Sequence, residues 1–264
     1  MPSKTGKSPS SYYKSDVSVD QSTNTGFDSS TRSIISGDGS QSSMSASDDV
    51  LSVQPVNDNT TGTMLVKNQG GSNILAVDTT NSKVLAGASQ VSVNTHFKEM
   101  GLYDFSPATA GYHYPLIANT MFIPDGATAF AADNDWGNGA DPATTLNLSG
   151  LTAQENAVAV YWYLENDITL DSVRWMATAD ASVILFFHLF AYDLDTSTNY
   201  GDLSGGIVHA NSFINVATAA TIRTGTFTLD EANIDAGKVV IGFVENATDT
   251  ADVTVSFNIK YHIR

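Results

Sequence analysis

The segment GTMLVKNQGGSNILAVDTTNSKVLAG (residues 62–87) contains three short apolar runs, at residues 64–66, 74–77 and 84–86. The turn-rich pieces NQGGSN and DTTNSK separate these runs, which recur at a spacing of about ten residues. This pattern is typical of short strands joined by tight turns, so we predict an all-β chain. Outward from this segment, the chain divides into an N-terminal arm (residues 1–59), a short β connecting region (60–90) and a globular β unit (91–264).

Strands of three or four residues are too short to form a stable sheet in a single chain. The three runs also lack a strict alternation of apolar and polar residues, which indicates burial on both faces. One hypothesis is therefore an intertwined homotrimeric stalk, in which three chains cover one another's strands. The alternative is a small meander packed on the main domain. The residues expected to mediate trimerisation are Leu65, Ile74, Leu75, Val77, Val84 and Leu85.

The same segment, followed by a globular β unit, resembles a stretch in structural proteins of tailed bacteriophages, those of marine phages in particular. In those proteins it joins an N-terminal virion-binding part to a distal domain. The resemblance covers residues 62–87 of 264. It implies a virion component assembled in the host cytoplasm, either a capsid decoration (cement) protein or a head fibre, with phage capsid or tail proteins as partners. A tail fibre or other adhesin that binds a host receptor or surface glycan is the alternative.

Composition excludes several other classes of protein. The formal net charge of −16 argues against a nucleic-acid binder, because phosphate contacts need clustered Lys and Arg. Cysteine is absent, which excludes disulfides and thiolate metal ligands. The first residues, MPSKTGKSPSSYY, lack the apolar core of a signal peptide, and no apolar run approaches the length of a membrane span. We therefore expect a protein that is made soluble inside a cell and does not insert into a membrane.

The arm, residues 1–59, is dominated by Ser, Thr, Asp, Gly and Asn. A free chain of this composition cannot bury enough apolar surface to offset its ordering entropy, so we expect it to be disordered on its own. One interpretation is a solubilising tail or linker. The other is an extended anchoring arm, in which isolated apolar side chains bind a neighbouring subunit. The candidate anchors are Tyr12, Tyr13, Phe27, Ile34 and Ile35.

The globular unit ends in the clearest strand of the chain, ADVTVSFNIKYHIR (residues 251–264). Strict alternation from Val253 to Ile263 predicts one buried and one exposed face, with His262 on the exposed face. Residues 182–194, SVILFFHLFAYDL, are almost continuously apolar and rich in β-branched and aromatic residues, which predicts a central strand buried on both faces. Further strands are predicted at residues 116–124, 144–150, 157–165, 167–177, 221–229 and 238–245. Together they predict an antiparallel β-sandwich of the jelly-roll type.

No catalytic constellation is recognisable, and no GxSxG motif accompanies any serine. The five histidines show no spacing typical of metal ligands, and His188, within the apolar run, is expected to be a hydrogen-bonded core residue. We therefore expect a protein that is not an enzyme, with no catalytic residues, no resident metal and no cofactor.

Two acidic loops, DNDWGNGAD (133–141) and DLDTSTNYGD (193–202), present alternate oxygen atoms of the kind that calcium binds. Ordinary turn chemistry is the favoured interpretation, because Asp, Asn and Gly are common between strands. The weak calcium candidates are Asp133, Asp135, Asp193 and Asp195. Trp136 is either exposed to a glycan or a neighbouring subunit, or tucked under the sandwich. The other aromatic residues expected in the core are Tyr161, Trp162, Tyr163 and Trp175.

Overall fold

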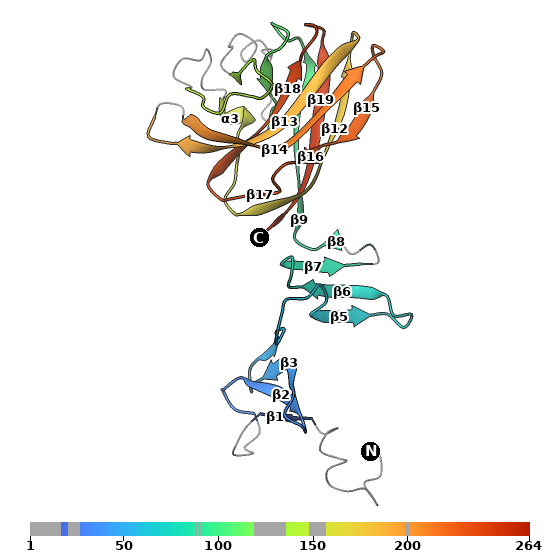
Figure 1. Cartoon of the computed structure of the whole chain (residues 1–264), viewed down its shortest axis with the longest axis vertical. Helices are drawn as coiled ribbons and strands as arrows, with labels where there is room; N and C mark the ends of the chain where they lie inside the picture. Colours follow the sequence, from blue (N-terminus) through green and yellow to red (C-terminus); the bar gives the residue numbers. More distant parts are fainter. Residues whose placement is uncertain are drawn as a thin grey trace, which may run out of the picture. The chain divides into compact units, whose positions relative to one another are not determined.

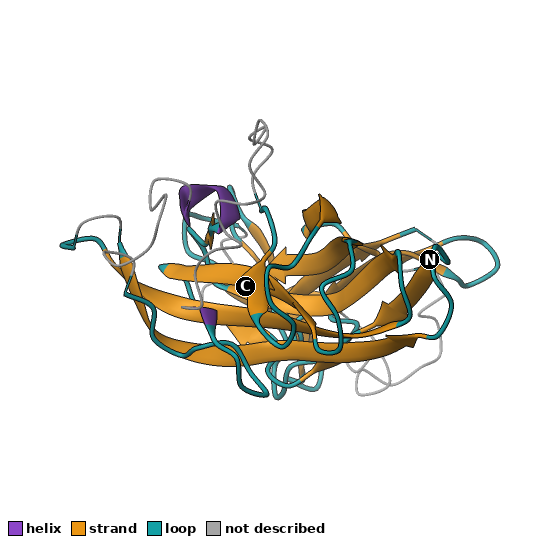
Figure 2. Ribbon diagram, turned by 90° about the horizontal axis from the view of Figure 1, so that it is seen from above, coloured by secondary structure: helices purple, strands orange, loops and turns teal. Residues whose placement is uncertain are grey.

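The computed structural model describes residues 17–20, 27–87, 89, 91–118, 136–147, 157–198 and 201–264. Strands make up most of this part of the chain (Figure 2), which confirms the predicted all-β class. The chain divides into two compact units, Met1–Asn94 and Thr95–Arg264, and each is described by itself. Among the described residues, no helix has the length and apolarity that crossing a bilayer requires.

The first unit contains an antiparallel meander of four strands in sequential order (Figure 1). They are β1 (Val17–Val19), β2 (Arg32–Ser36), β3 (Gln41–Ala46) and β4 (Leu51–Val53). The expectation that the arm lacks regular structure on its own is wrong for these residues. Backbone pairing between neighbouring strands, rather than a core, holds the meander, because Ala46 is the one buried apolar residue among its strands.

The second sheet of the first unit contains the strands predicted from the opening segment. They are β5 (Met64–Lys67), β6 (Asn73–Asp78) and β7 (Lys83–Ala86), followed by the two-residue strand β8 (Val91–Ser92). All neighbours pair antiparallel in the order β5-β6-β7-β8. The predicted turns also form, with Gly71 (φ 83°) between β5 and β6 and Ser82 (φ 55°) between β6 and β7 in the left-handed region. We call these strands the small sheet.

The second unit is a sandwich of two antiparallel sheets (Figure 1). One sheet has the order β10 (His113–Pro115), β18 (Lys238–Asn246), β13 (Val183–Asp195), β14 (Asp202–Val216) and β16 (Thr228–Leu229), with β11 (Trp162–Tyr163) also paired to β18. The other has the order β15 (Arg223–Thr226), β12 (Ile168–Ala179), β19 (Val253–Ile263) and β9 (Thr95–Phe105), with β17 (Asn233–Ile234) paired to β12. The sandwich prediction is confirmed at this level.

The main core lies between the two sheets and is rich in aromatic rings. The ring of Phe187, on β13, lies 5.7 Å from that of Phe257 on β19 and 5.0 Å from that of Trp175 on β12 (centroid distances). Phe227 also packs against Phe257, edge to face, at 4.8 Å. Offset and edge-to-face contacts of this kind are the favoured geometry of aromatic pairs.

The opposite face of β13 is buried as well, against a second apolar cluster. Phe190 and Tyr192, which alternate with the inward-facing residues of β13, pack there with Phe243 of β18. Trp136 and Leu146, from the segment that covers this face, complete the cluster. The prediction that residues 182–194 form a strand buried on both faces is therefore confirmed.

Several details differ from the sequence-based prediction. Residues 157–165 were expected to form one strand, but the chain makes the helical turn α3 (Ala157–Val160) before β11. A short apolar run fits a buried helical turn as well as a strand, so its sequence does not distinguish them. The long strands β9 and β14 were not predicted, because polar residues and glycines interrupt their apolar alternation. Residues 116–118 and 144–147 contribute the isolated bridges Gly101↔Ile117 and Leu146↔Leu203, and the rest of those two predicted strands lies outside the described residues.

Two side chains differ from the prediction in their exposure to solvent. Tyr163 is 53% exposed, although it was expected in the core with Tyr161, Trp162 and Trp175, which are buried. His262 was expected on the exposed face of β19 but is buried, with its Nδ1 atom 3.1 Å from an Asp171 carboxylate oxygen. The register of β12 against β19 shifts between Leu170 and Ser172, and this bulge places Asp171 beside His262.

Candidate functional site

One face of the small sheet carries two neighbouring rows of apolar side chains and has no buried residue. Strand register places Met64, Val77 and Val84 in one cross-strand row, and Val66, Leu75, Ala86 and Val91 in the next row on the same face. All seven side chains are exposed or half-buried. We call this the apolar face. An unburied apolar face of this kind is a candidate interaction surface.

The six residues predicted to mediate trimerisation fall on both faces of the small sheet. Leu75, Val77 and Val84 belong to the apolar face. Leu65, Ile74 and Leu85 lie on the opposite face, together with the buried Ala76. Leu65 and Ile74 are themselves exposed, so both faces present apolar surface.

The region around the small sheet carries little charge. Between residues 60 and 94 the charged residues are Lys67, Asp78 and Lys83, which sum to +1, whereas the whole chain carries −16. Like-charged chains repel one another, so copies of an acidic protein approach most easily through their least acidic surface. The small sheet is such a surface.

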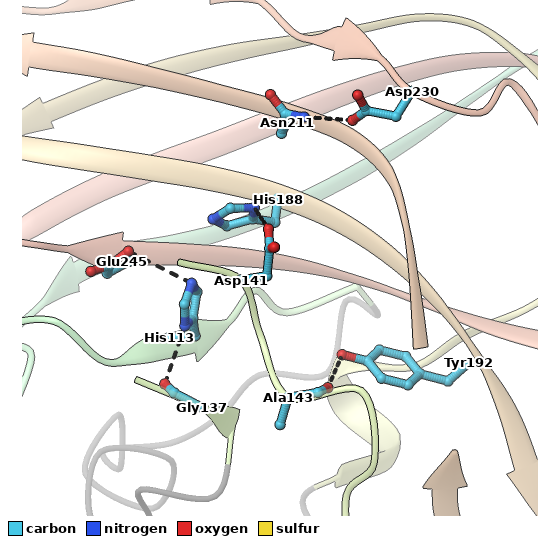
Figure 3. A network of polar contacts seen from close by, with 9 residues as sticks. All are labelled: His113, Gly137, Asp141, Ala143, His188, Tyr192, Asn211, Asp230 and Glu245. Carbon is cyan, nitrogen blue, oxygen red and sulfur yellow. Dashed lines mark hydrogen bonds and ion pairs between the residues drawn. The ribbon is translucent and has the colours of Figure 1, made fainter. Parts of the chain in front are cut away.

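A second candidate site lies on the outer face of the larger sheet of the sandwich (Figure 3). His113 on β10 pairs directly with Glu245 on β18, so both side chains point to the same face. His188 on β13 pairs with Phe243, two positions along β18 from Glu245, and therefore shares that face. The potential ligand atoms of His113, His188 and Glu245 all lie within 4.8 Å of one another, and all three residues are buried.

A fixed loop covers these three side chains. It begins at Trp136, which is 1% exposed, and its Gly137 carbonyl accepts hydrogen bonds from both the backbone N–H and Nδ1 of His113, at 3.0 and 3.1 Å. Gly137 has φ 100°, and an added Cβ there would lie 2.7 Å from the backbone nitrogen of Ala143, so glycine is required at this position. The hydroxyl of Tyr192 donates to the Ala143 carbonyl at 2.9 Å, which holds the far end of the loop.

The same loop contains Asp141, which lies at the edge of the group formed by His113, His188 and Glu245. Its Oδ1 atom lies 3.7 Å from Nδ1 of His188, and its side chain is 62% exposed. On the other side, Nε2 of His113 lies 3.6 Å from Oε2 of Glu245. The side chains of His113, Glu245 and His188 come from the neighbouring strands β10, β18 and β13. Together with Asp141 from the loop, they form a group at the surface of the sandwich.

Burial controls the protonation of this group. It lowers the pKa of His188 to about 3, with a smaller contribution from His113, because the charged imidazolium loses its hydration. Burial also lowers the pKa of His113, partly opposed by the Gly137 carbonyl and by Asp141. The pKa of Glu245 is raised by burial. Both imidazoles are therefore neutral near pH 7, and each keeps a lone pair on one ring nitrogen.

The sequence pattern gives no sign of this site. His113 and His188 belong to different strands, 75 positions apart, and spacing rules detect only ligands that share one element. The expectation that His188 is a buried core residue is confirmed, but its expected hydrogen bonds are absent: neither of its ring nitrogens has a hydrogen-bond partner among the residues that the structure describes. No motif in the sequence signals the convergence.

The calcium candidates show the contacts of ordinary turns and surface ion pairs. Asp193 accepts a 2.7 Å hydrogen bond from Nζ of Lys238. Asp195 accepts hydrogen bonds from the backbone N–H and hydroxyl of Ser197, at 2.9 and 2.6 Å, which is the geometry of an Asx turn. Asp133 and Asp135 lie outside the described residues. Trp136 takes the buried alternative of the two that were considered.

Three of the five candidate anchors of the arm lie among the described residues. Phe27 is 57% exposed, and Ile34 and Ile35 on β2 are half-buried. Tyr12 and Tyr13 lie outside the described residues. The described arm thus presents apolar side chains to its surroundings without a core of its own.

A groove of about 480 Å³ crosses the outer face of the smaller sheet of the sandwich. The residues that line it include the charged Glu99 and Arg174, the amide-bearing Asn258 and the exposed Met176. The groove therefore combines polar and apolar surface.

Comparisons with known proteins place the chain in no family: no protein-family model matches it, and no curated protein matches it significantly.

Proposed function

We propose that this protein is a non-enzymatic structural component of a tailed-phage virion, either a capsid decoration protein or a head fibre. In this proposal residues 1–59 bind the particle, the small sheet joins three copies of the chain, and the sandwich projects from the particle. The observation that carries the proposal is the apolar face of the small sheet. Its seven side chains form two complete cross-strand rows of apolar residues, and none of them is buried within the chain.

The occupant that best fits this face is the small sheet of another copy of the chain. Burial of apolar surface contributes about 25 cal/mol per Å², so two rows of Val, Leu and Met side chains covered by neighbours add substantial association energy. The local charge of +1 avoids the repulsion that the rest of the acidic chain would cause. Because the opposite face also exposes Leu65 and Ile74, each sheet has apolar surface for two neighbours, which a closed trimer requires.

The arm supports the particle-binding part of the proposal. Phe27, Val17 and Leu51 are exposed large apolar residues on a segment without a core. Each would contribute a weak contact with a capsid or tail protein, and three arms in one trimer would raise the overall avidity. In this view the role of the protein depends on multivalent attachment rather than on one strong site.

The test is the mass in solution of the full chain, measured by light scattering. The proposal expects a particle of three times 28.0 kDa. The double variant Val66→Asp and Val91→Asp places two carboxylates on the apolar face, at positions already exposed in the single chain. It should be monomeric, because burying unpaired charges between copies is costly.

The matched control is the double variant Ser72→Asp and Thr80→Asp, which adds the same two charges at exposed turns of the small sheet. It should remain trimeric. A monomeric parent protein, or a Val66→Asp and Val91→Asp variant with the mass of the parent, would remove the small sheet as the assembly device.

A second candidate function is supported by the groove on the smaller sheet of the sandwich. Glu99, Arg174 and Asn258 offer hydrogen-bonding groups beside the exposed side chain of Met176, a mixed polar and apolar surface of the kind that small-molecule sites present. The chain would then be a tail fibre or another adhesin that recognises a host glycan. Screening the full chain against immobilised glycans, with Arg174→Ala as the comparison, tests this alternative: binding that Arg174→Ala abolishes would favour the adhesin.

A further inference from the structure

We propose that His113, His188 and Glu245, with Asp141 at the rim, form a binding site for a divalent transition-metal ion of the zinc type. The site lies in the sandwich unit and involves no residue of the small sheet or the arm. It therefore goes beyond the proposed assembly role and does not depend on it.

The two histidines have buried ring nitrogens without hydrogen-bond partners among the described residues. His113 and His188 are both more than nine-tenths buried, and Nε2 of His113 and both ring nitrogens of His188 have no hydrogen-bond partner among the described residues. Buried polar atoms are almost always paired, because leaving one unpaired costs about 1–3 kcal/mol. Each histidine offers one ring nitrogen to the point where Glu245 also offers an oxygen, all within 4.8 Å of one another, which indicates that something binds there.

The tautomer of His113 also favours a bound cation. The carbonyl of Gly137 can only accept a hydrogen bond, so Nδ1 of His113 must carry the proton, and neutral His113 then has its lone pair on Nε2. That lone pair faces the carboxylate of Glu245 at 3.6 Å. Two acceptors that face each other repel, and a cation between them converts the repulsion into two bonds. A backbone carbonyl that orients a ligating imidazole is the usual outer-shell arrangement of metal sites.

The donor set selects the class of metal. Two imidazoles and a carboxylate suit zinc and its neighbours in the first transition row, whereas calcium and magnesium prefer oxygen ligands throughout. Asp141 can supply a fourth ligand, because its Oδ1 atom already lies 3.7 Å from His188. Two ligand atoms on one zinc ion lie about 3–3.5 Å apart. The ligand atoms of this group lie up to 4.8 Å apart, so side-chain rotations must bring them about 1 Å closer to one another. The exposed side chain of Asp141 marks the path by which an ion enters.

The experiment is a calorimetric titration of the untagged, full-length protein with Zn²⁺ after treatment with a chelator, in buffer that contains excess Mg²⁺ and Ca²⁺. We expect one Zn²⁺ per chain. Co²⁺ should give the visible absorption of a tetrahedral site and should be displaced by Zn²⁺. At a hundredfold excess of Zn²⁺ over its Kd, the Tm of the sandwich should rise by about 5–10 °C.

Two variants remove ligands in different ways. His188→Gln and the nearly isosteric Glu245→Gln should each weaken Zn²⁺ binding by more than about a hundredfold, because losing even an outer-shell partner costs 10–100-fold. Tryptophan fluorescence reports whether each variant is folded, and Glu245→Gln keeps the test valid if His188→Gln fails to fold. The control is His96→Gln, which removes an exposed histidine outside the group and should bind Zn²⁺ like the parent.

Absence of saturable binding by the parent protein would overturn the proposal, and so would equal binding by the parent and Glu245→Gln. In the first case a shared proton, rather than a metal, would join His113 to Glu245. Light scattering with and without Zn²⁺ separates this inference from the assembly proposal: the site should fill without any change in oligomeric mass.

Discussion

The small sheet and the sandwich are built from the same kind of strand pairing but bury their side chains very differently. In the small sheet, Val66 and Val91 remain 42% and 48% exposed. On β19 of the sandwich, Phe257 and Ile259 are fully buried. The difference arises because the inner faces of the two sandwich sheets cover each other, whereas four strands of two to six residues cannot cover themselves.

This comparison shows where each region obtains its stability. A sandwich with a closed aromatic core is stable as a single chain, since its apolar surface is removed from water within one molecule. The small sheet gains the same benefit only when another chain covers it, so its stability should depend on protein concentration. The predictions below test this contrast, from the largest expected effect to the smallest.

The largest effect is expected in the sandwich core. Phe257→Ala removes a ring that packs against Phe187 and Phe227, and it should lower the free energy of unfolding by about 3–5 kcal/mol. Urea denaturation followed by tryptophan fluorescence measures this directly, because all three tryptophans lie in the sandwich unit. Val66→Ala in the small sheet should leave that transition unchanged, and equal losses in the two variants would contradict the comparison.

Acid should destabilise the sandwich through His188. Its pKa is about 3 in the folded chain and near 6.5 when unfolded, so the unfolded state binds a proton first as the pH falls. In a chelating buffer, its contribution to stability is complete above pH 6.5 and decreases towards pH 3, by at most about 1.4 kcal/mol per pH unit. Glu245, whose pKa is raised, acts in the opposite direction, and His113 and Asp141 are the other titratable groups that face His188.

The variant His188→Phe isolates this effect. Its stability, measured by urea denaturation between pH 7 and 4, should fall less steeply than that of the parent protein. Parallel curves would show that His188 does not govern the acid response. The small sheet has no histidine and should show no matching change.

Dilution should affect only the small sheet. If a trimer covers the apolar face, a hundredfold dilution lowers the stability of the assembled sheet by about 2 kcal/mol per chain. Hydrogen exchange of the amides in β6 and β7 should accelerate accordingly, while exchange in β13 and β18 stays constant. Concentration-independent exchange in β6 would show that the single chain stabilises its own sheet.

The smallest effect is expected at the turn between β6 and β7. The carboxylate of Asp78 accepts hydrogen bonds from the backbone N–H and side-chain amide of Asn81, at 2.9 and 2.8 Å. Asp78→Ala should therefore destabilise the small sheet by about 1 kcal/mol, seen as faster exchange in β6 and β7 without a shift in the tryptophan transition. The exposed neighbour Thr80 provides the control, and Thr80→Ala should have no measurable effect.

The sequence predicted the strands with a strong local pattern. The alternation of residues 253–263 and the apolar run of 182–194 each correspond to one strand, β19 and β13. β9 and β14 were missed because their patterns are weak and their pairing partners, β19 and β13, supply the stability that local propensity does not. The burial of His262 was missed for a similar reason, since a bulge in the neighbouring strand brings Asp171 to it.

Residues 62–87 by themselves determined the three short strands, their turns and the excess of apolar residues, because these depend on neighbours within a few positions. Only the tertiary structure decided that seven of these apolar side chains share one uncovered face, since a face depends on the register between strands. It also decided that His113, His188 and Glu245 meet. Three polar residues far apart in sequence become neighbours because β10, β18 and β13 lie side by side in one sheet, and antiparallel pairing turns their side chains to the same side.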